Sequence, residues 1–165
     1  MDNATISGWE QRLSELVPLY GHRNWIVVAD AAYPAQSNPG IETIVAGGDQ
    51  VAAVRKVLDA IKAAKHIRAN VYLDRELAAV NDLDAPGVQA YRQMLDLALG
   101  GADVQRIPHE EIIHKLDDAA RLVSVLIIKT GMTIPYTSVF FELDCGYWNA
   151  AAEERLRTAI AACSK

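Results

Sequence analysis

The sequence predicts an α/β domain in which a largely parallel central sheet is flanked by helices. Short apolar runs rich in β-branched residues alternate with segments of helical periodicity along the chain, which is the pattern of a layered α/β fold. The 165 residues suffice for one domain with a sizeable core, and a composition of 51% hydrophobic and 22% charged residues is typical of a globular protein. No internal repeat or low-complexity tract is visible.

The first half of the chain contains two predicted helices and three predicted strands. The helices have apolar positions three or four residues apart and cover residues 8–18 and 50–66. Pro18 ends the first helix, and Asp49 has the position of an N-cap before the second. The strands are compact apolar or β-branched runs at residues 24–30, 41–47 and 69–74.

The second half of the chain continues the alternation. One helix is predicted to begin near Pro86 and to end at Gly100–Gly101, because glycine favours helix C-termini. Residues 109–122 and 149–163 have helical periodicity and form the last two predicted helices. The predicted strands of this half are residues 102–108, 123–131 and 138–144, with a turn containing Pro135 between the last two.

Charge and cysteine content narrow the partners and the compartment. A net charge of −5 makes a nucleic acid or an anionic membrane surface an unfavourable partner. No apolar stretch reaches the roughly 20 residues of a membrane helix, and the first residues lack the pattern of a signal peptide. Cys145 and Cys163 form no metal-like cluster and are expected to be free thiols, with a disulfide as the minority alternative. We therefore expect a soluble cytoplasmic protein.

Several kinds of site have weak support in the sequence. Gly47–Gly48 before a helix gives the outline of a phosphate-binding turn, but the glycine motifs of nucleotide sites are missing and Asp49 is negative. The four histidines form no H-x-x-x-H pair, and His109 and His114 lie about 500° apart around a helix. The sequence therefore predicts neither a nucleotide site nor a metal site, and it has no G-x-S-x-G elbow for a nucleophile.

The remaining candidates are polar residues at the ends of elements: His22, Asp30, His114 and Tyr136, with Lys129 as a weaker fifth candidate. Ligands of α/β sheets lie at the carboxyl ends of the strands, so the loop after Asp30 and the loop after Lys129 are predicted to line one pocket. Each residue also has a plain structural explanation, such as a turn-capping role for Asp30. The residue types alone leave both explanations open.

Two segments resemble a known family. "GHRNWIVVADAAYPAQS" is similar to the G-H-x-[DN]-x-[IL]-[VI]-[VIF]-x-D-A-x-[FLY]-P segment of the D-ribose pyranase and L-fucose mutarotase family, RbsD/FucU. "VLIIKTGMTIPYTSVFFE" resembles that family's I-x-[ST]-G-E-x-x-x-Y-[AG]-N-[IL]-[IL]-L segment. His114 precedes Gly131 by the same number of residues as the family's site histidine or arginine precedes its glycine. The likeness extends to about residue 144.

The resemblance implies an RbsD-like fold and a set of site residues. His22 would be the proton-donating acid, Asp30 a substrate ligand and His114 a further sugar contact, while the loop that binds sugar hydroxyls would comprise Tyr136, Thr137 and Ser138. The family also implies a ring-shaped homo-oligomer, with a decamer expected and with sites near subunit boundaries. Two positions depart from the pattern, because Ser138 stands where asparagine is usual and Met132 where glutamate is usual. Residues 145–165 would be a helical extension of a single domain that spans 1–165.

These residues suit a reaction that needs no cofactor and no metal. Opening the cyclic hemiacetal of a sugar requires one group to protonate the ring oxygen and another to take the anomeric proton, and histidine can do either. The predicted function is thus a monosaccharide mutarotase or pyranase of the fucose or ribose class, and the alternative is a non-catalytic, transport-associated sugar-binding protein. His22 and Asp30 lie at opposite ends of a strand. Either the His22 loop folds back toward Asp30, or His22 completes the pocket of a neighbouring subunit.

Overall fold

The structure is a computed structural model that describes residues 8–163, and it contains one six-stranded sheet in the order β2-β5-β1-β6-β3-β4. The strands are β1 (Trp25–Ala29), β2 (Ile41–Val45), β3 (Ile67–Asp74), β4 (Val104–Ile107), β5 (Val125–Lys129) and β6 (Val139–Cys145). The helices are α1 (Gly8–Leu16), α2 (Gln50–Ala63), the 3-10 helix η1 (Arg75–Ala79), α3 (Val88–Leu99), α4 (His109–Ala120) and α5 (Ala150–Cys163). The predicted α/β fold class is confirmed.

The sheet is parallel except for β6. β1 and β2 both pair in parallel with β5, and β3 pairs in parallel with β4, whereas β6 runs antiparallel between β1 and β3. A parallel return of the chain needs a crossover of a dozen or more residues, and the segment from β5 to β6 spans only residues 130–138. The carboxyl ends of five strands and the amino end of β6 therefore share one edge of the sheet.

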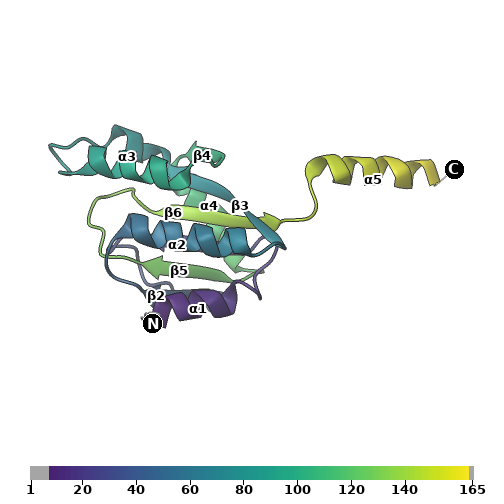
Figure 1. Cartoon of the computed structure of the whole chain (residues 1–165), viewed down its shortest axis with the longest axis horizontal. Helices are drawn as coiled ribbons and strands as arrows, with labels where there is room; N and C mark the ends of the chain where they lie inside the picture. Colours follow the sequence, from purple (N-terminus) through teal and green to yellow (C-terminus); the bar gives the residue numbers. More distant parts are fainter. Residues whose placement is uncertain (1–7, 164–165) are drawn as a thin grey trace, which may run out of the picture.

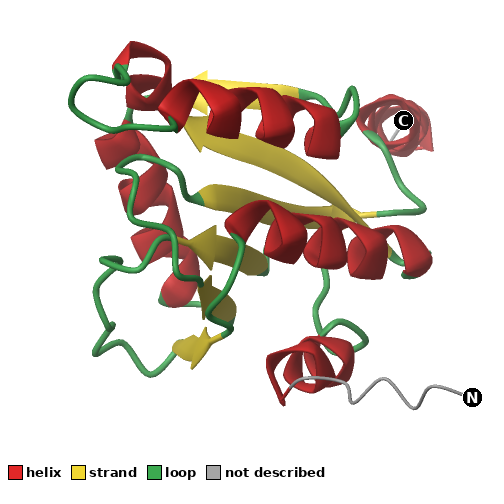
Figure 2. Cartoon of the chain, turned by 60° about the vertical axis from the view of Figure 1, so that its left-hand side comes forward, coloured by secondary structure: helices red, strands yellow, loops and turns green. Residues whose placement is uncertain are grey.

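Helices cover both faces of the sheet (Figure 2). Apolar side chains of α1, α2 and α3 pack with one face, as Leu16, Val54 and Leu95 illustrate. On the other face, Ile112 and Leu116 of α4 pack against side chains such as Trp25 and Phe140. Because both faces are covered, all five residues of β1 are buried, and full burial of an aliphatic side chain contributes about 1.5–3 kcal/mol.

The ends of the helices follow local sequence signals. The predicted N-cap of α2 is confirmed, since the Asp49 carboxylate accepts a hydrogen bond from the Ala52 amide at 2.7 Å. α3 ends at Gly100, which has the left-handed conformation (φ 56°) that glycine adopts without strain. α2 is three residues shorter than predicted, because Ala64 is already extended.

α5 projects away from the rest of the chain (Figure 1). It has no buried residue, although Leu156 and Ile160 give it apolar positions four residues apart. Cys145 and Cys163 are both free thiols. Within residues 8–163, no helix is long and apolar enough to cross a membrane.

Candidate functional site

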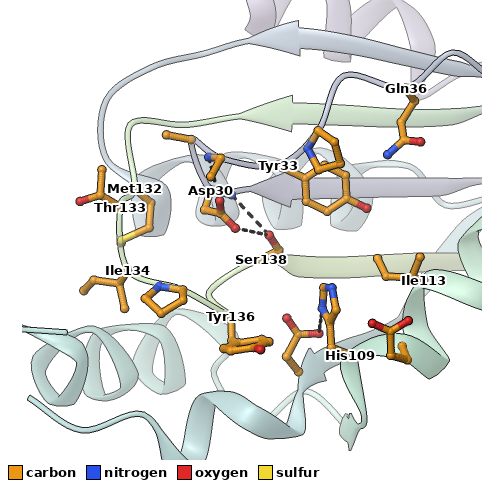
Figure 3. A pocket seen from close by; sticks show the side chains of 16 residues that line it. Asp30, Tyr33, Gln36, His109, Ile113, Met132, Thr133, Ile134, Tyr136 and Ser138 are labelled. Carbon is orange, nitrogen blue, oxygen red and sulfur yellow. Dashed lines mark hydrogen bonds and ion pairs between the residues drawn. The ribbon is translucent and has the colours of Figure 1, made fainter. Parts of the chain in front are cut away.

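A cavity of about 710 Å³ lies at the shared carboxyl edge of the sheet (Figure 3). Its walls come from the loop after β1, the end of β3, the first turn of α4 and the segment between β5 and β6. The volume is in the range of small-molecule sites, and this edge is where parallel sheets bind ligands. The two loops that the sequence analysis assigned to one pocket meet here.

Asp30 is held in a fixed orientation inside this cavity. One carboxylate oxygen accepts a hydrogen bond from the Ala32 amide at 2.9 Å, and the other accepts from the Ser138 hydroxyl at 3.2 Å. The Asp30 amide in turn donates to the Ser138 oxygen at 3.3 Å. The carboxylate therefore caps the turn that follows β1 and also faces the cavity. Asp30 thus has the turn-capping role named in the sequence analysis, and it also lines the cavity.

The segment between β5 and β6 forms the second wall of the cavity. Tyr136 has a left-handed backbone (φ 59°), which costs a non-glycine residue about 1–2 kcal/mol. The residue is 40% exposed, and its ring meets the His109 ring edge-on, with the centroids 5.6 Å apart. Backbone strain of this kind persists only where surrounding structure fixes it, and it is common at binding sites.

A buried polar network fixes the base of that wall. The Gln50 amide nitrogen donates to the Thr137 carbonyl and to the Tyr91 hydroxyl, and the Gln50 carbonyl accepts from Thr130 at 2.7 Å. The Tyr91 hydroxyl also donates to the Thr137 carbonyl at 2.6 Å. Burial raises the pKa of Tyr91, so its hydroxyl stays a donor. The network ties both ends of the wall to α2 and α3.

His109 and Asp74 form a pair at the bottom of the cavity that the sequence analysis missed. The distance from His109 Nδ1 to Asp74 Oδ1 is 3.1 Å, and the Asp74 side chain is 1% exposed. Burial raises the pKa of the Asp74 carboxyl, although the contact with His109 acts to lower it. The signal was present, since Asp74 ends one predicted strand and His109 follows another at the same edge.

The cavity is acidic around an apolar wall. Asp30, Asp74 and Glu110 contribute carboxyl groups, and the described residues that line the cavity include neither lysine nor arginine. Met132 and Ile134 provide apolar surface on one side. Such a site favours an uncharged ligand with several hydroxyl groups and repels phosphate or carboxylate groups.

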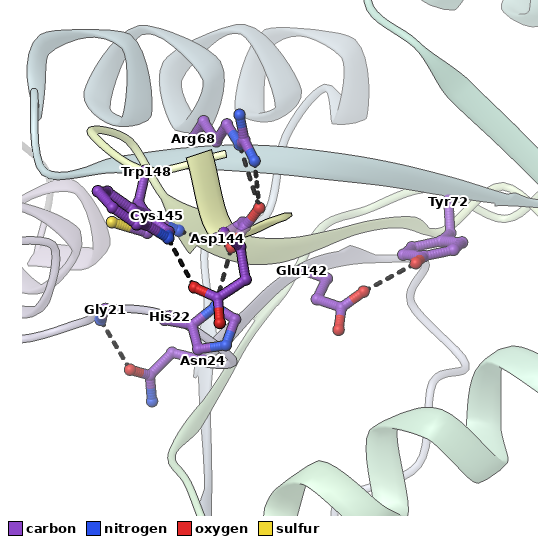
Figure 4. A network of polar contacts seen from close by, with 10 residues as sticks. Gly21, His22, Asn24, Arg68, Tyr72, Glu142, Asp144, Cys145 and Trp148 are labelled. Carbon is purple, nitrogen blue, oxygen red and sulfur yellow. Dashed lines mark hydrogen bonds and ion pairs between the residues drawn. The ribbon is translucent and has the colours of Figure 1, made fainter. Parts of the chain in front are cut away.

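His22 lies at the opposite edge of the sheet from the cavity. Its Nδ1 is 2.9 Å from Asp144, which also accepts from Arg68 at 2.6 Å (Figure 4). The Arg68 contact is the main reason that the pKa of Asp144 is lowered. The His22 side chain is 64% exposed and β1 separates it from Asp30. The His22 loop therefore does not fold back toward Asp30 in the same chain.

Two further predicted site residues lie outside the cavity. His114 is exposed, because it is about 140° around α4 from His109 and faces solvent. Thr137 is fully buried, and its hydroxyl donates to the Ile134 carbonyl at 2.8 Å. Asp30, Tyr136 and Ser138 line the cavity as the sequence analysis expected. Residues 8–163 contain no cluster of three or more side chains able to hold a metal ion.

Comparison with known proteins identifies the family. Bacillus subtilis RbsD complexed with D-ribose matches with a TM-score of 0.56 and 18% identity, covering 90% of this chain and 99% of that chain. Fucose mutarotase from Streptococcus pneumoniae in complex with L-fucose matches with the same score and identity, covering 87% and 98%. FucU from Bifidobacterium longum matches with a TM-score of 0.54 and 13% identity, covering 81% and 94%.

At these identities the likeness establishes the fold. No curated protein matches the sequence significantly. The sequence profile of the RbsD / FucU transport protein family, in contrast, matches residues 9–146, which leaves α5 outside the match. The chain therefore belongs to the RbsD / FucU transport protein family.

Proposed function

We propose that this chain is a cofactor-independent monosaccharide mutarotase or pyranase that acts on a free sugar of the fucose or ribose class. The observation that carries the proposal is the cavity lined by the oriented Asp30 carboxylate and by the paired rings of Tyr136 and His109. The carboxylate, the hydroxyl and the imidazole can form hydrogen bonds with sugar hydroxyls, and an imidazole can act as a general acid or base. The family and the ligands named for the two related structures point to the same substrate class.

The reaction requires one net proton transfer. A base takes the proton from the anomeric hydroxyl, its oxygen forms the C=O bond, and the C1–ring-oxygen bond breaks with its electron pair on the ring oxygen. An acid protonates that oxygen. Reclosure on either face of the carbonyl gives either anomer, and closure by another hydroxyl gives the other ring size. No electrons leave the sugar.

His22 of a neighbouring subunit is the proposed acid. Its exposed ring is oriented by Asp144 at the far edge of the sheet, so it can reach only a cavity outside its own chain. We therefore propose a ring-shaped homo-oligomer, a decamer by family analogy, in which His22 of one copy meets Asp30 of the next. In this proposal His109 replaces His114 as the additional sugar contact, since it is His109 that lines the cavity.

One observation favours a second candidate, a non-catalytic sugar-binding protein associated with transport. Within one chain the cavity lacks His22, and its wall has Met132 and Ser138 where glutamate and asparagine are usual in the family. A serine hydroxyl offers fewer hydrogen bonds than an amide. This candidate predicts sugar binding without faster anomer exchange.

Saturation-transfer NMR of sugar anomers separates the two candidates. The enzyme proposal predicts that the wild-type chain accelerates exchange and that His22→Ala and Asp30→Ala each lower the rate constant by about 100-fold. A mixture of the two variants should regain activity if each site uses two subunits. His114→Ala should change the rate less than twofold, since His114 lies on the solvent side of α4. Sugar binding with no added exchange would support the second candidate instead.

A further inference from the structure

Asp74 is a buried carboxyl group that the proposed reaction has not yet used. It is the last residue of β3 and is 2% exposed. Among the described residues, neither of its oxygens has a partner in hydrogen-bond geometry. A buried carboxylate without such partners is unfavourable, so a structural role alone gives no reason for an acid at this position. Groups of this kind concentrate at functional sites.

The ring of His109 lies beside Asp74, and among residues 8–163 no other side chain forms an ion pair with this carboxyl group. Nδ1 of His109 is itself buried, and among the described residues it too has no partner in hydrogen-bond geometry. The two atoms are 3.1 Å apart, but the ring N–H is not aligned with the carboxylate, as in many sites before their ligand binds. The Asp74 carboxyl group and Nδ1 of His109 can therefore form a hydrogen bond with each other after a small rotation.

The backbone around His109 restricts how its ring can move. The His109 amide donates to both oxygens of the Glu76 carboxylate, at 3.2 and 3.0 Å, which fixes the first residue of α4. The Tyr136 ring packs edge-on against the imidazole. Other titratable groups also surround Asp74. Asp30, Tyr33, Glu110 and Tyr136 line the cavity with it, Glu76 lies nearby, and Arg92, Asp96 and Arg106 line a small hollow behind it.

We propose that Asp74 is a positioning residue that holds the proton of His109 on Nδ1 and so leaves Nε2 as the base for the anomeric hydroxyl. In its ionised form Asp74 only accepts hydrogen bonds, so Nδ1 of His109 then carries the proton that faces it. Nε2 then has a free lone pair and takes the proton from O1 while the acid protonates the ring oxygen. This inference rests on the proposed function and names the base of that reaction.

Replacing Asp74 with asparagine should lower activity without lowering the stability of the fold. Burial raises the pKa of Asp74, so the folded chain binds its proton more tightly than the unfolded chain. The stability linked to Asp74 is therefore present below its unfolded pKa and is lost as the pH rises through the folded pKa. Asp74→Asn removes this ionisation and should not lower the thermal midpoint at neutral pH. A residue with a merely structural role would lower stability and activity together.

The test compares the full-length wild type with Asp74→Asn, His109→Gln and the double variant. We expect Asp74→Asn to lower kcat for anomer exchange about 10- to 100-fold with KM changed less than about twofold, and the double variant to be no worse than His109→Gln. Asp96→Asn removes an exposed carboxylate that contacts Arg106, and it should leave kcat unchanged. Thermal unfolding followed by circular dichroism gives the stability of each variant.

Imidazole ¹⁵N shifts give a readout that needs no turnover. With ¹⁵N-histidine labelling and assignment by His109→Gln, neutral His109 should carry its proton on Nδ1 in the wild type and lose this preference in Asp74→Asn. An unchanged tautomer, or an unchanged kcat beside an active wild type, would overturn the inference. A wild type without exchange activity would refute the proposed function, while the tautomer would still test whether Asp74 positions His109.

Discussion

Replacing Gln50 with methionine tests whether the buried network fixes the wall of the cavity. Methionine has a similar length but makes none of the three hydrogen bonds of Gln50. Each is worth about 0.5–1.5 kcal/mol net. The loss is partly offset, because the Thr137 carbonyl keeps the Tyr91 hydroxyl and the Thr130 hydroxyl keeps the Ala29 carbonyl. We therefore expect Gln50→Met to lower the free energy of unfolding by about 2 kcal/mol.

Urea unfolding and thermal unfolding measure this loss. For a chain of this length, about 2 kcal/mol corresponds to a fall of roughly 4–8 °C in the midpoint. Gln93→Met is the matched control on the exposed face of α3 and should stay within about 0.5 kcal/mol of the wild type. Affinity for the sugar should also fall, because Thr130 and Thr137 lie near the two ends of the segment between β5 and β6 that lines the cavity. A Gln50→Met variant as stable as Gln93→Met would refute the reasoning.

Three further outcomes follow from other parts of the molecule. The pKa of Glu42 is lowered mainly by its hydrogen bonds to Arg12, so this stabilisation is present above the unfolded pKa of Glu42 and is lost as the pH falls through the folded value. Arg12→Met should lower the unfolding free energy slightly at neutral pH and leave it unchanged in acid, which urea unfolding at several pH values can measure. A chain that ends at Gly146 should keep its unfolding free energy within about 0.5 kcal/mol, because no residue of α5 is buried; a larger loss in a concentration-dependent assay would show that α5 packs between copies. By calorimetry, ribose 5-phosphate should bind about tenfold more weakly than ribose, because the described residues that line the cavity include acidic side chains but neither lysine nor arginine; equal affinity would contradict the electrostatic argument.

The sequence predicted the fold well because its local signals agree with one another. The apolar runs that became β1 and β5 have no polar face, which is typical of central strands covered on both sides. The N-cap Asp49 and the glycine at the end of α3 marked helix ends to within a residue. The antiparallel direction of β6 was not predicted, although the short connection of residues 130–138 between β5 and β6 was a signal for it.

The site was predicted only in part, for geometric reasons. The rule that ligands lie at carboxyl ends of strands found Asp30, and the resemblance added Tyr136 and Ser138. Counting back from Gly131 led to His114, but the helical rotation of α4 turns that residue to solvent and brings His109 to the cavity. Asp74 was overlooked because an aspartate at a strand end looks like a turn residue until its burial is known.

The rate of exchange between sugar anomers in the presence of the wild-type chain tests the central claim most directly. The measurement uses saturation-transfer NMR with fucose, ribose, galactose and glucose, and it compares the wild type with Asp30→Asn, which removes the charge of the oriented carboxylate. The account predicts faster exchange for at least one of these sugars and a fall of about 100-fold in Asp30→Asn. A wild type that adds nothing to the spontaneous rate for all four sugars, or an Asp30→Asn variant as fast as the wild type, would contradict it.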